Sequence, residues 1–365
     1  MNEFENWDVK ASDFPTKGTD AEKLRFLVRY AILAPSSHNS QPWLFHLHDD
    51  HVDLVADRRR ALPEVDPFDR ELIISCGAAL AFLQVAAIGL GCKPAVRRFP
   101  AEDKEDLLAS LQLSGLREAS AQDVDLFRAI LNRRTCRQAF GPKPIAADAR
   151  NALQAAAEKA GARATWIDDS NDRSQLAELI MTADRQQFEN RAFRGELATW
   201  IRPSAASAAD GMPAPAFGIE FPASYVAPLM IRTFDLGSGR AARDEELLKG
   251  SPGILVFTTP LDEPYDWLVC GEALGIVVLT AEAFGLNASY LNQPCEVPEL
   301  RTRLGLIDDV SGNPQLVLRL GYGTRVQRTP RRPVEEVIVD RVRARKISGE
   351  RARRGGAAKA KAKRK

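Results

Sequence analysis

The chain has 365 residues, of which 45% are hydrophobic and 27% charged, with a formal net charge of +1. This length and apolar content suffice for one large or two ordinary domains with a full core, so we expect a soluble globular protein. The first 14 residues are acidic and polar, without the basic stub and apolar run of a secretory signal, which favours a cytoplasmic protein.

The five cysteines are scattered and form no CxxC pair. This arrangement argues against a disulfide framework and against a zinc knuckle, and favours buried thiols. The four histidines all lie between residues 38 and 51, where His46 and His48 share one face of an expected strand. Because no further His or Cys accompanies this pair, we expect a solvated hairpin and no metal site.

The first expected helix begins at a capping box, Thr19-Asp20-Ala21-Glu22, and carries one apolar stripe to about Ala34. A loop follows, in which three Ser, an Asn and a Gln stand between two prolines, as residues 35–42. An apolar run that starts at Trp43 then predicts a strand at Trp43–Leu47, and a second short strand is expected at Val52–Ala56.

Two long apolar segments repeat each other. Residues 76–91 (CGAALAFLQVAAIGLG) align without a gap with residues 270–285 (CGEALGIVVLTAEAFG) at a constant offset of 194, which superposes Gly77 on Gly271. Residues 72–92 are long enough to span a membrane. The repetition instead favours two core helices at the centre of a duplicated fold, each burying its faces against the other.

The second half has its own pattern. It opens with clustered arginines in residues 132–140, followed by an expected helix at 146–160 that Gly161 ends. A Trp-started apolar run comes next at Trp166, and later strands are expected at Gly253–Thr259 and Gln315–Gly321. The polar loop occurs only in the first half and the arginine cluster only in the second.

These motifs resemble the nitroreductase family of FMN-dependent flavoproteins, over roughly residues 20–340. The family's RRSxRxF-like opening is matched by residues 133–140 and its APSxxNxQPW loop by residues 34–43. The double length, the Asn292-Gln293-Pro294 turn and the Thr-Pro-Arg-Arg-Pro ending at 329–333 resemble its Acg-type branch. The implied fold is α+β: a nitroreductase-like unit duplicated in one chain as a pseudo-dimer, with mainly antiparallel sheets flanked by helices around two long central apolar helices.

The resemblance implies one FMN per chain, because only one pairing of the halves brings both motifs together. Arg133 and Arg331 would hold its phosphate, with Arg332 or Arg328 as alternatives, since guanidinium groups contact phosphate oxygens at two points. Thr135 would bind the ribityl chain or the phosphate. The full implied set of cofactor-binding residues is Pro35, Ser36, Ser37, Asn39, Arg133, Arg134, Thr135, Arg137, Asn292, Arg328, Arg331 and Arg332.

Arg137 would lie near the pyrimidine edge of the flavin, where positive charge stabilises the reduced ring. Pro35, Ser36, Ser37 and Asn39 would hold the ribityl and pyrimidine groups, while Gln41 would orient their loop rather than touch the cofactor. No catalytic residue and no metal ligand is predicted.

The expected domains are a first half at 20–118, a second half at 119–340 with an insertion at about 181–250, and a basic tail at 341–365. The tail holds twelve Lys/Arg and one Glu, and we expect it to be disordered. The insertion resembles a lid over the flavin, although an excursion packed on the surface is an equal alternative.

Two functions follow from the resemblance. The first is an oxidoreductase that transfers hydride from NAD(P)H through flavin N5 to nitro or quinone-like acceptors. The second is an FMN-binding or FMN-sequestering protein whose lid prevents turnover. We expect no membrane association, a monomer or weak homo-oligomer, and no nucleic-acid partner, because no aromatic residues accompany the charges of the tail.

Overall fold

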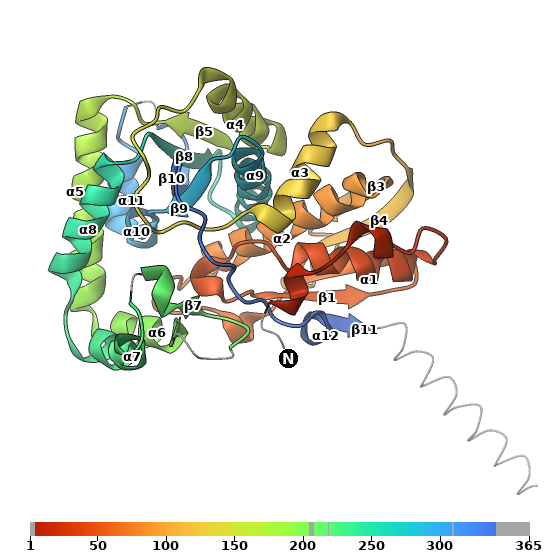
Figure 1. The fold of residues 1–365 in the computed structure, drawn as a ribbon, viewed down its shortest axis with the longest axis horizontal. Coiled ribbons are helices and arrows are strands. Elements are labelled where there is room, and N and C mark those ends of the chain that lie inside the picture. The colour runs from red at the N-terminus through yellow and green to blue at the C-terminus, as the bar shows by residue number, and fades with distance from the viewer. Residues whose placement is uncertain (1–3, 204–207, 218, 309, 341–365) are drawn as a thin grey trace, which may run out of the picture.

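The computed structural model describes residues 4–203, 208–217, 219–308 and 310–340. The basic tail at 341–365 lies outside these residues. The described chain forms two sheets on either side of a central helix pair (Figure 1). The pair consists of α2 (Arg70–Gly89) and α9 (Pro264–Ala283), the two segments in which the sequence repeats.

The first sheet contains β1 (Trp43–Leu47), β2 (His51–Ala56), β3 (Cys92–Arg98), β4 (Leu107–Leu116) and β11 (Ile338–Asp340), in the order β11-β1-β2-β4-β3. Neighbouring strands of this sheet are antiparallel, except that β11, from the end of the described chain, is parallel to β1. The predicted strand at β1 is confirmed without change, and β2 begins one residue earlier than predicted.

The second sheet is wholly antiparallel and has the order β5-β8-β10-β9. Its strands are β5 (Arg163–Trp166), β8 (Gly253–Thr259), β9 (Asn287–Tyr290) and β10 (Asn313–Gly321). The strand at β8 is as predicted, whereas Trp166 ends β5 and does not start it. With β11 left aside, the four strands of each sheet therefore lie in the order first, second, fourth, third, and the central helix comes between the second and third strands in the chain.

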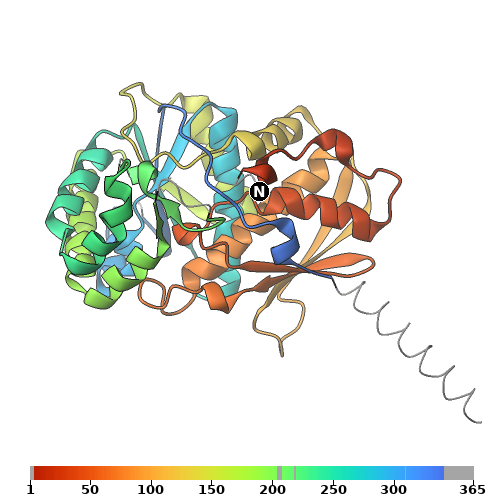
Figure 2. The ribbon, with the colours of Figure 1, turned by 60° about the horizontal axis from the view of Figure 1, so that its bottom comes forward.

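A helix precedes the first strand of each sheet. α1 (Asp20–Ala31) begins at the predicted capping box, where the Thr19 hydroxyl and the Glu22 carboxylate each accept from the other residue's backbone N–H. It lies against the first sheet, as Figure 2 shows. α4 (Ala147–Ala160) ends at Gly161, whose φ of +99° is the left-handed conformation predicted for a glycine cap.

The central helices cross at glycines. A Cβ atom on Gly77 would lie 2.2 Å from the carbonyl oxygen of Leu268, and one on Gly271 would lie 2.1 Å from that of Ile74. The two glycines, which superpose in the sequence repeat, thus allow the backbones to approach closely. α2 is long and apolar enough to cross a membrane, but 83% of its most apolar 18-residue window is buried inside the fold, as in a core helix.

Residues 167–252 form an insertion between β5 and β8 that has no counterpart between β1 and β2. It contains α5 (Ser170–Glu189), α6 (Arg191–Trp200), α7 (Ala223–Thr233) and α8 (Gly237–Lys249), together with the short parallel pair β6 (Ile201–Arg202) and β7 (Met212–Pro213). α5 packs along α8 at one side of the molecule, and α6 packs on α7 (Figure 1). The remaining helices are α3 (Ala121–Asn132), α10 (Gln293–Glu296), α11 (Pro298–Leu304) and α12 (Val334–Val337).

Candidate functional site

A cavity of about 630 Å³ lies where the two halves and the insertion meet. Its size is typical of a small-molecule or cofactor site. Ten of the twelve residues implied by the family resemblance line it: Pro35, Ser36, Ser37, Asn39, Arg133, Arg134, Thr135, Arg137, Asn292 and Arg331.

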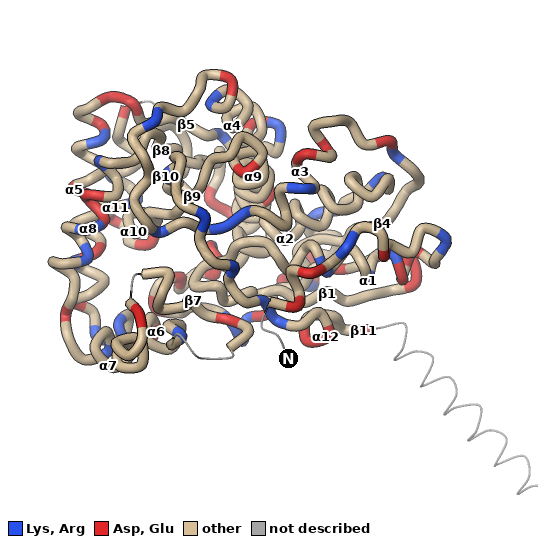
Figure 3. The backbone as a smooth tube through the Cα atoms, in the orientation of Figure 1, with Lys and Arg blue, Asp and Glu red and all other residues tan. Residues whose placement is uncertain are grey.

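One end of the cavity is strongly basic. Arg133, Arg134 and Arg331 are each at most 5% exposed, and no carboxylate of the described residues lies within ion-pair distance of them. The Nε atoms of all three are buried without a hydrogen-bond partner. Figure 3 shows Lys and Arg positions along the chain in the middle of the molecule. The terminal nitrogens of these groups donate to neutral oxygens of the chain, such as the Leu33 carbonyl, which leaves their charge without a counter-ion. Three buried guanidinium groups without a carboxylate partner are suited to a bound anion.

Trp7 anchors this basic end. Its ring lies 4.6 Å from the guanidinium carbon of Arg134 and 5.2 Å from that of Arg331, within cation–π range. The indole N–H donates to the carbonyl of Thr329 at 2.9 Å, which ties the N-terminal segment to the chain that carries Arg331. No sequence pattern indicated this role, because Trp7 precedes the region of family resemblance.

Burial lowers the pKa of all three guanidinium groups, and like charge adds to this for Arg134 and Arg331. Burial is the larger cause for Arg331, whose pKa is well below its usual value, and like charge from Arg133 and Arg134 adds to it. The pKa of Arg134 falls to about 10, first through burial and then through Arg133. A dianion at this position would offset the repulsion and favour the charged forms.

The arginine motif is held in place by the second sheet. Arg133 follows the last residue of α3, and the chain then runs beside β9, where the Cys136 N–H donates to the Ala288 carbonyl at 3.0 Å. Arg319 of β10 donates to the Cys136 and Gln138 carbonyls at 3.0 and 2.9 Å. This anchoring fixes the direction in which the motif's side chains enter the cavity.

Asn292 is fixed in a similar way by β10. Its side-chain oxygen accepts from the N–H of Val317 at 3.0 Å, so that the turn before α10 is tied to the strand beside it. The residue lines the cavity, as the resemblance implies.

The polar loop has an unusual backbone. His38, Asn39 and Gln41 have φ values of 52°, 54° and 52°, in the left-handed region that costs non-glycine residues about 1–3 kcal/mol each. Hydrogen bonds hold this conformation: the Ser37 N–H donates to the Ser75 hydroxyl at 3.2 Å, and the Gln41 N–H to the Ser36 hydroxyl at 3.0 Å.

Burial, followed by the charge of Arg137, lowers the pKa of His38 to about 4. His38 is therefore neutral near pH 7. The Ser37 hydroxyl donates to the carboxylate of Glu71 in α2, which also lines the cavity. The same carboxylate accepts a hydrogen bond from the Arg70 guanidinium at 3.2 Å.

Asn39 differs from the role that the resemblance implies. Its amide nitrogen donates to the carbonyls of Gly211 at 2.9 Å and Pro330 at 3.2 Å, while its oxygen accepts from Arg331 at 3.1 Å. Both the nitrogen and the oxygen of its side-chain amide are therefore bonded to other residues of the chain. In this structure Asn39 orients Arg331 at the basic end and does not offer its amide to the rest of the cavity.

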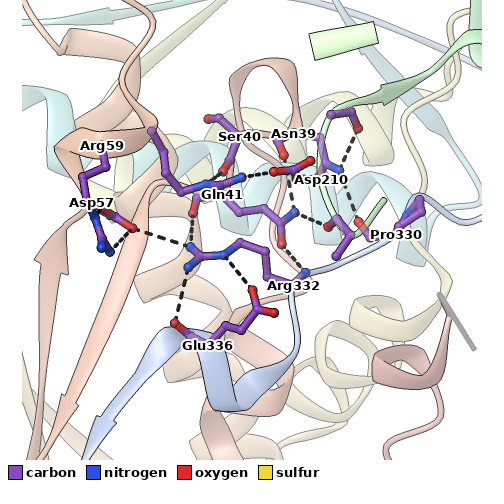
Figure 4. Close-up of polar contacts among 12 residues, drawn as sticks. Asn39, Ser40, Gln41, Asp57, Arg59, Asp210, Pro330, Arg332 and Glu336 are labelled. Carbon is purple, nitrogen blue, oxygen red and sulfur yellow. Dashed lines mark hydrogen bonds and ion pairs between the residues drawn. The ribbon is translucent and has the colours of Figure 1, made fainter. Parts of the chain in front are cut away.

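Arg332 and Arg328 do not line the cavity. Arg332 turns toward Asp57 and Glu336 and donates to the Gln41 carbonyl at 3.1 Å (Figure 4). Arg328 pairs with Asp8 at 3.4 Å. The Gln41 side chain accepts from the Arg332 N–H at 2.9 Å and does not line the cavity either, in keeping with the structural role expected for it.

The insertion supplies part of the cavity wall and is fastened to the first half. Arg60 forms an ion pair with Asp210, and the Gly211 N–H donates to the Asn39 carbonyl at 3.3 Å. Figure 4 shows Asp210 near Asn39 and Gln41 of the polar loop. Phe217 packs on Arg137, 4.9 Å from its guanidinium carbon. The part of the cavity wall that the insertion supplies runs from Asp184 to Leu247, within the predicted lid segment.

Two buried carboxylates face the cavity from the insertion. Gln293 donates to both, to Asp184 at 3.2 Å and to Asp244 at 2.7 Å. Burial and then the neighbouring Asp244 raise the pKa of Asp184 to about 7. Arg240 pairs with Asp244 at 2.8 Å. The sequence analysis missed this group, since its members come from three helices far apart along the chain.

The chain has relatives over nearly its full length. It is 31% identical over 326 residues to the Mycobacterium tuberculosis (strain H37Rv) protein named "Putative NAD(P)H nitroreductase Rv3131", covering 87% of this chain and 92% of that protein. The chain therefore belongs to the nitroreductase family. A second relative, "Putative NAD(P)H nitroreductase acg" of the same strain, is 28% identical over 339 residues, which are 89% of this chain and 97% of that protein. The similarity to acg confirms the predicted branch.

Other comparisons are more distant. No protein-family model matches the chain. A solved structure with partial similarity is the FMN-dependent nitroreductase NfnB from Mycobacterium smegmatis in complex with NADPH, with 19% identity over 58% of this chain and 96% of that one, and a TM-score of 0.38. The family assignment rests on the full-length relatives.

Proposed function

We propose that the chain binds one FMN in the cavity and acts as an NAD(P)H-dependent oxidoreductase of nitroreductase type. The observation that carries this proposal is the basic end, where three buried guanidinium groups lack both a carboxylate and a partner for Nε. A phosphate dianion fits this donor set, because guanidinium groups bind phosphate oxygens in two-point contacts. Arg133, Arg134 and Arg331 would hold it, with Thr135 beside them.

FMN would supply a ring that takes hydride from NAD(P)H and passes it to a nitro or quinone-like acceptor. The chain's own residues position and tune this group. Arg137, half-buried in the cavity, would place positive charge near the ring and favour its reduced form. Ser36 and Ser37 line the cavity on the other half and offer hydroxyl oxygens to the ribityl chain.

We also propose that the chain is a duplicated unit folded as a pseudo-dimer. The shared strand order of the two sheets, and the crossing of α2 and α9 at equivalent glycines, support this idea. Under a twofold relation the polar loop and the arginine motif would each occur twice, but the chain carries each once. One chain would then build one site, without needing a second copy. A cytoplasmic setting, as expected from the sequence, would supply NAD(P)H.

The contacts of the insertion support an alternative, an FMN-sequestering protein. Asp210 pairs with Arg60, and Phe217 covers Arg137, so the side from which NAD(P)H and an acceptor would approach is occupied by protein. Such a protein would retain FMN with little turnover.

A visible spectrum distinguishes the two functions. Purified protein is loaded with FMN, treated with NADH or NADPH without oxygen, and then given a quinone. An oxidoreductase loses its absorbance near 450 nm and regains it with the quinone. A sequestering protein stays yellow throughout, and a protein that takes up no FMN contradicts both functions.

A further inference from the structure

The β1–β2 hairpin gathers metal-ligating side chains on one face. A two-residue turn, Asp49-Asp50, joins the strands, and the His48 N–H donates to the His51 carbonyl at 2.9 Å. Burial alternates along both strands, so that His48, His51 and Asp53 share the partly exposed face, opposite the core. This hairpin lies outside the cavity and takes no part in the proposed function.

The imidazoles converge on one carboxylate. Nε2 of His48 lies 3.2 Å from Oδ2 of Asp53, and Nε2 of His51 lies 3.7 Å from its Oδ1. The two rings are stacked, with centroids 4.2 Å apart and an angle of 7° between their planes. One ligand atom from each residue lies within 4.8 Å of the others. In a tetrahedral zinc site such atoms would stand about 2.0–2.2 Å from the metal, so small side-chain shifts would complete the coordination.

A second carboxylate orients one of the histidines. Nδ1 of His51 is 2.7 Å from Oδ1 of Asp50. If Nδ1 carries the proton donated to this carboxylate, the lone pair of His51 is on Nε2, the atom that faces Asp53. Metal-ligating histidines are commonly oriented in this way by a carboxylate on the other ring nitrogen.

The surroundings favour a cation. A hollow lined by His46, His48 and Asp53 is closed on its other side by residues 102–107, which include four acidic side chains and Lys104. Arg58 also lines the hollow and pairs with Asp106, so the acidic side chains outnumber the basic ones. All five cysteines are buried, so thiolates do not compete for a metal at the surface. Imidazole and carboxylate ligands without sulfur suit Zn²⁺, Ni²⁺ and Cu²⁺ better than Ca²⁺ or Mg²⁺.

We propose that His48, His51 and Asp53 form a binding site for one divalent transition-metal ion, zinc in the first place. The three ligands leave a fourth position open to water or an external group. The sequence analysis considered His46 and His48 along one strand. The structure instead points to a group that spans the hairpin, because the tight turn brings His51 opposite His48, and Asp53, opposite His46, lies on the same face.

The bound metal would tie the turn ends of β1 and β2 together. Asp49 is exposed and lies outside the ligand group, so it provides a matched control in the same turn.

Zinc chloride is titrated into the full chain in competition with a chromophoric chelator, at pH 7.5 and without added FMN. We expect one Zn²⁺ per chain, with the affinity reduced at least about tenfold in His51→Ala and in Asp53→Asn. Asp49→Asn should bind as the unmodified chain does. Circular dichroism of each variant confirms that the hairpin substitutions leave the fold intact.

Two results would overturn the proposal. One is an unmodified chain that binds zinc no more tightly than His51→Ala. The other is one Zn²⁺ per chain retained in all three variants, which places the metal elsewhere. The titration is independent of flavin binding, so its outcome neither supports nor weakens the proposed oxidoreductase function.

Discussion

The two halves of the molecule share a strand order but differ in what they bring to the cavity. The first half brings a polar loop with three left-handed residues between Ser36 and Gln41. The second half brings the arginine motif, Arg331 and the insertion of residues 167–252. Between helix and strand the second half has only Gly161 and Ala162, where the first has the whole loop. Similar frameworks thus carry complementary functional parts, which predicts one site per chain.

Gly271→Ala tests the shared framework and should have the largest effect. The new Cβ would lie 2.1 Å from the Ile74 carbonyl oxygen, and the central helices would have to move apart. Overpacking of this kind costs about 3 kcal/mol. Urea unfolding should show the loss, whereas Gly195→Ala in α6, with nothing within 4 Å of its added Cβ, should not destabilise the chain. Equal stability of the two variants would contradict a close crossing at Gly271.

Arg133→Gln tests the contribution of the second half to the basic end. Loss of one guanidinium from a phosphate site should weaken FMN binding about 100-fold, as charge-assisted contacts are worth about 1.5–3 kcal/mol. Quenching of FMN fluorescence measures the affinity. The matched control is Arg328→Gln, because Arg328 lies beside Trp7 but does not line the cavity. Similar losses in both variants would mean that general charge, and not the buried cluster, attracts the cofactor.

The pH dependence of stability tests the environment of Asp184, which the insertion brings to the cavity. Its pKa of about 7 in the folded chain exceeds the ordinary aspartate value of 3.8, because burial and Asp244 disfavour its charge. A raised pKa contributes stability that is fully present below pH 3.8 and is lost as the pH rises toward 7. Asp184→Asn should not show this loss. Its free energy of unfolding should therefore rise by about 2 kcal/mol relative to that of the unmodified chain as the pH increases from 5 to 7. A difference in urea midpoint between Asp184→Asn and the unmodified chain that stays the same from pH 5 to pH 7 would contradict the raised pKa of Asp184.

Asp210→Asn tests the attachment of the insertion and should have the smallest effect. Asp210 is partly exposed, so its ion pair with Arg60 is worth less than 1 kcal/mol. We expect the reduction of bound FMN by NADPH to accelerate roughly threefold, measured by stopped flow at 450 nm. Asp168→Asn, which removes the ion pair with Arg150 at the surface away from the cavity, is the control. Equal rates in all three proteins would argue that the insertion does not limit access.

Local signals in the sequence predicted much of the framework. The capping box at Thr19 and the glycine cap at Gly161 depend on neighbouring residues, and the structure confirms both. The strand at Trp43–Leu47 follows from a short apolar run that starts at Trp43. The site residues Trp7 and Asp184 could not be predicted in this way, because each reaches the cavity through contacts with segments distant in the chain.

Arg331 and Arg332 show a second limit of sequence reasoning. The motif does not say which of two adjacent arginines enters the site. Pro333 favours extended backbone at Arg332, and adjacent side chains in extended backbone point in opposite directions. In the structure Arg331 faces the cavity and Arg332 the Asp57 carboxylate.

The count of FMN molecules per chain tests the complementary halves most directly. The protein is saturated with FMN, freed of excess, and denatured to release the cofactor for quantitation against protein concentration. We predict one FMN per chain, in a chain that is monomeric at the working concentration. Two FMN per chain would contradict a single complementary pairing of the halves, and none would contradict the assignment of the basic end to a flavin phosphate.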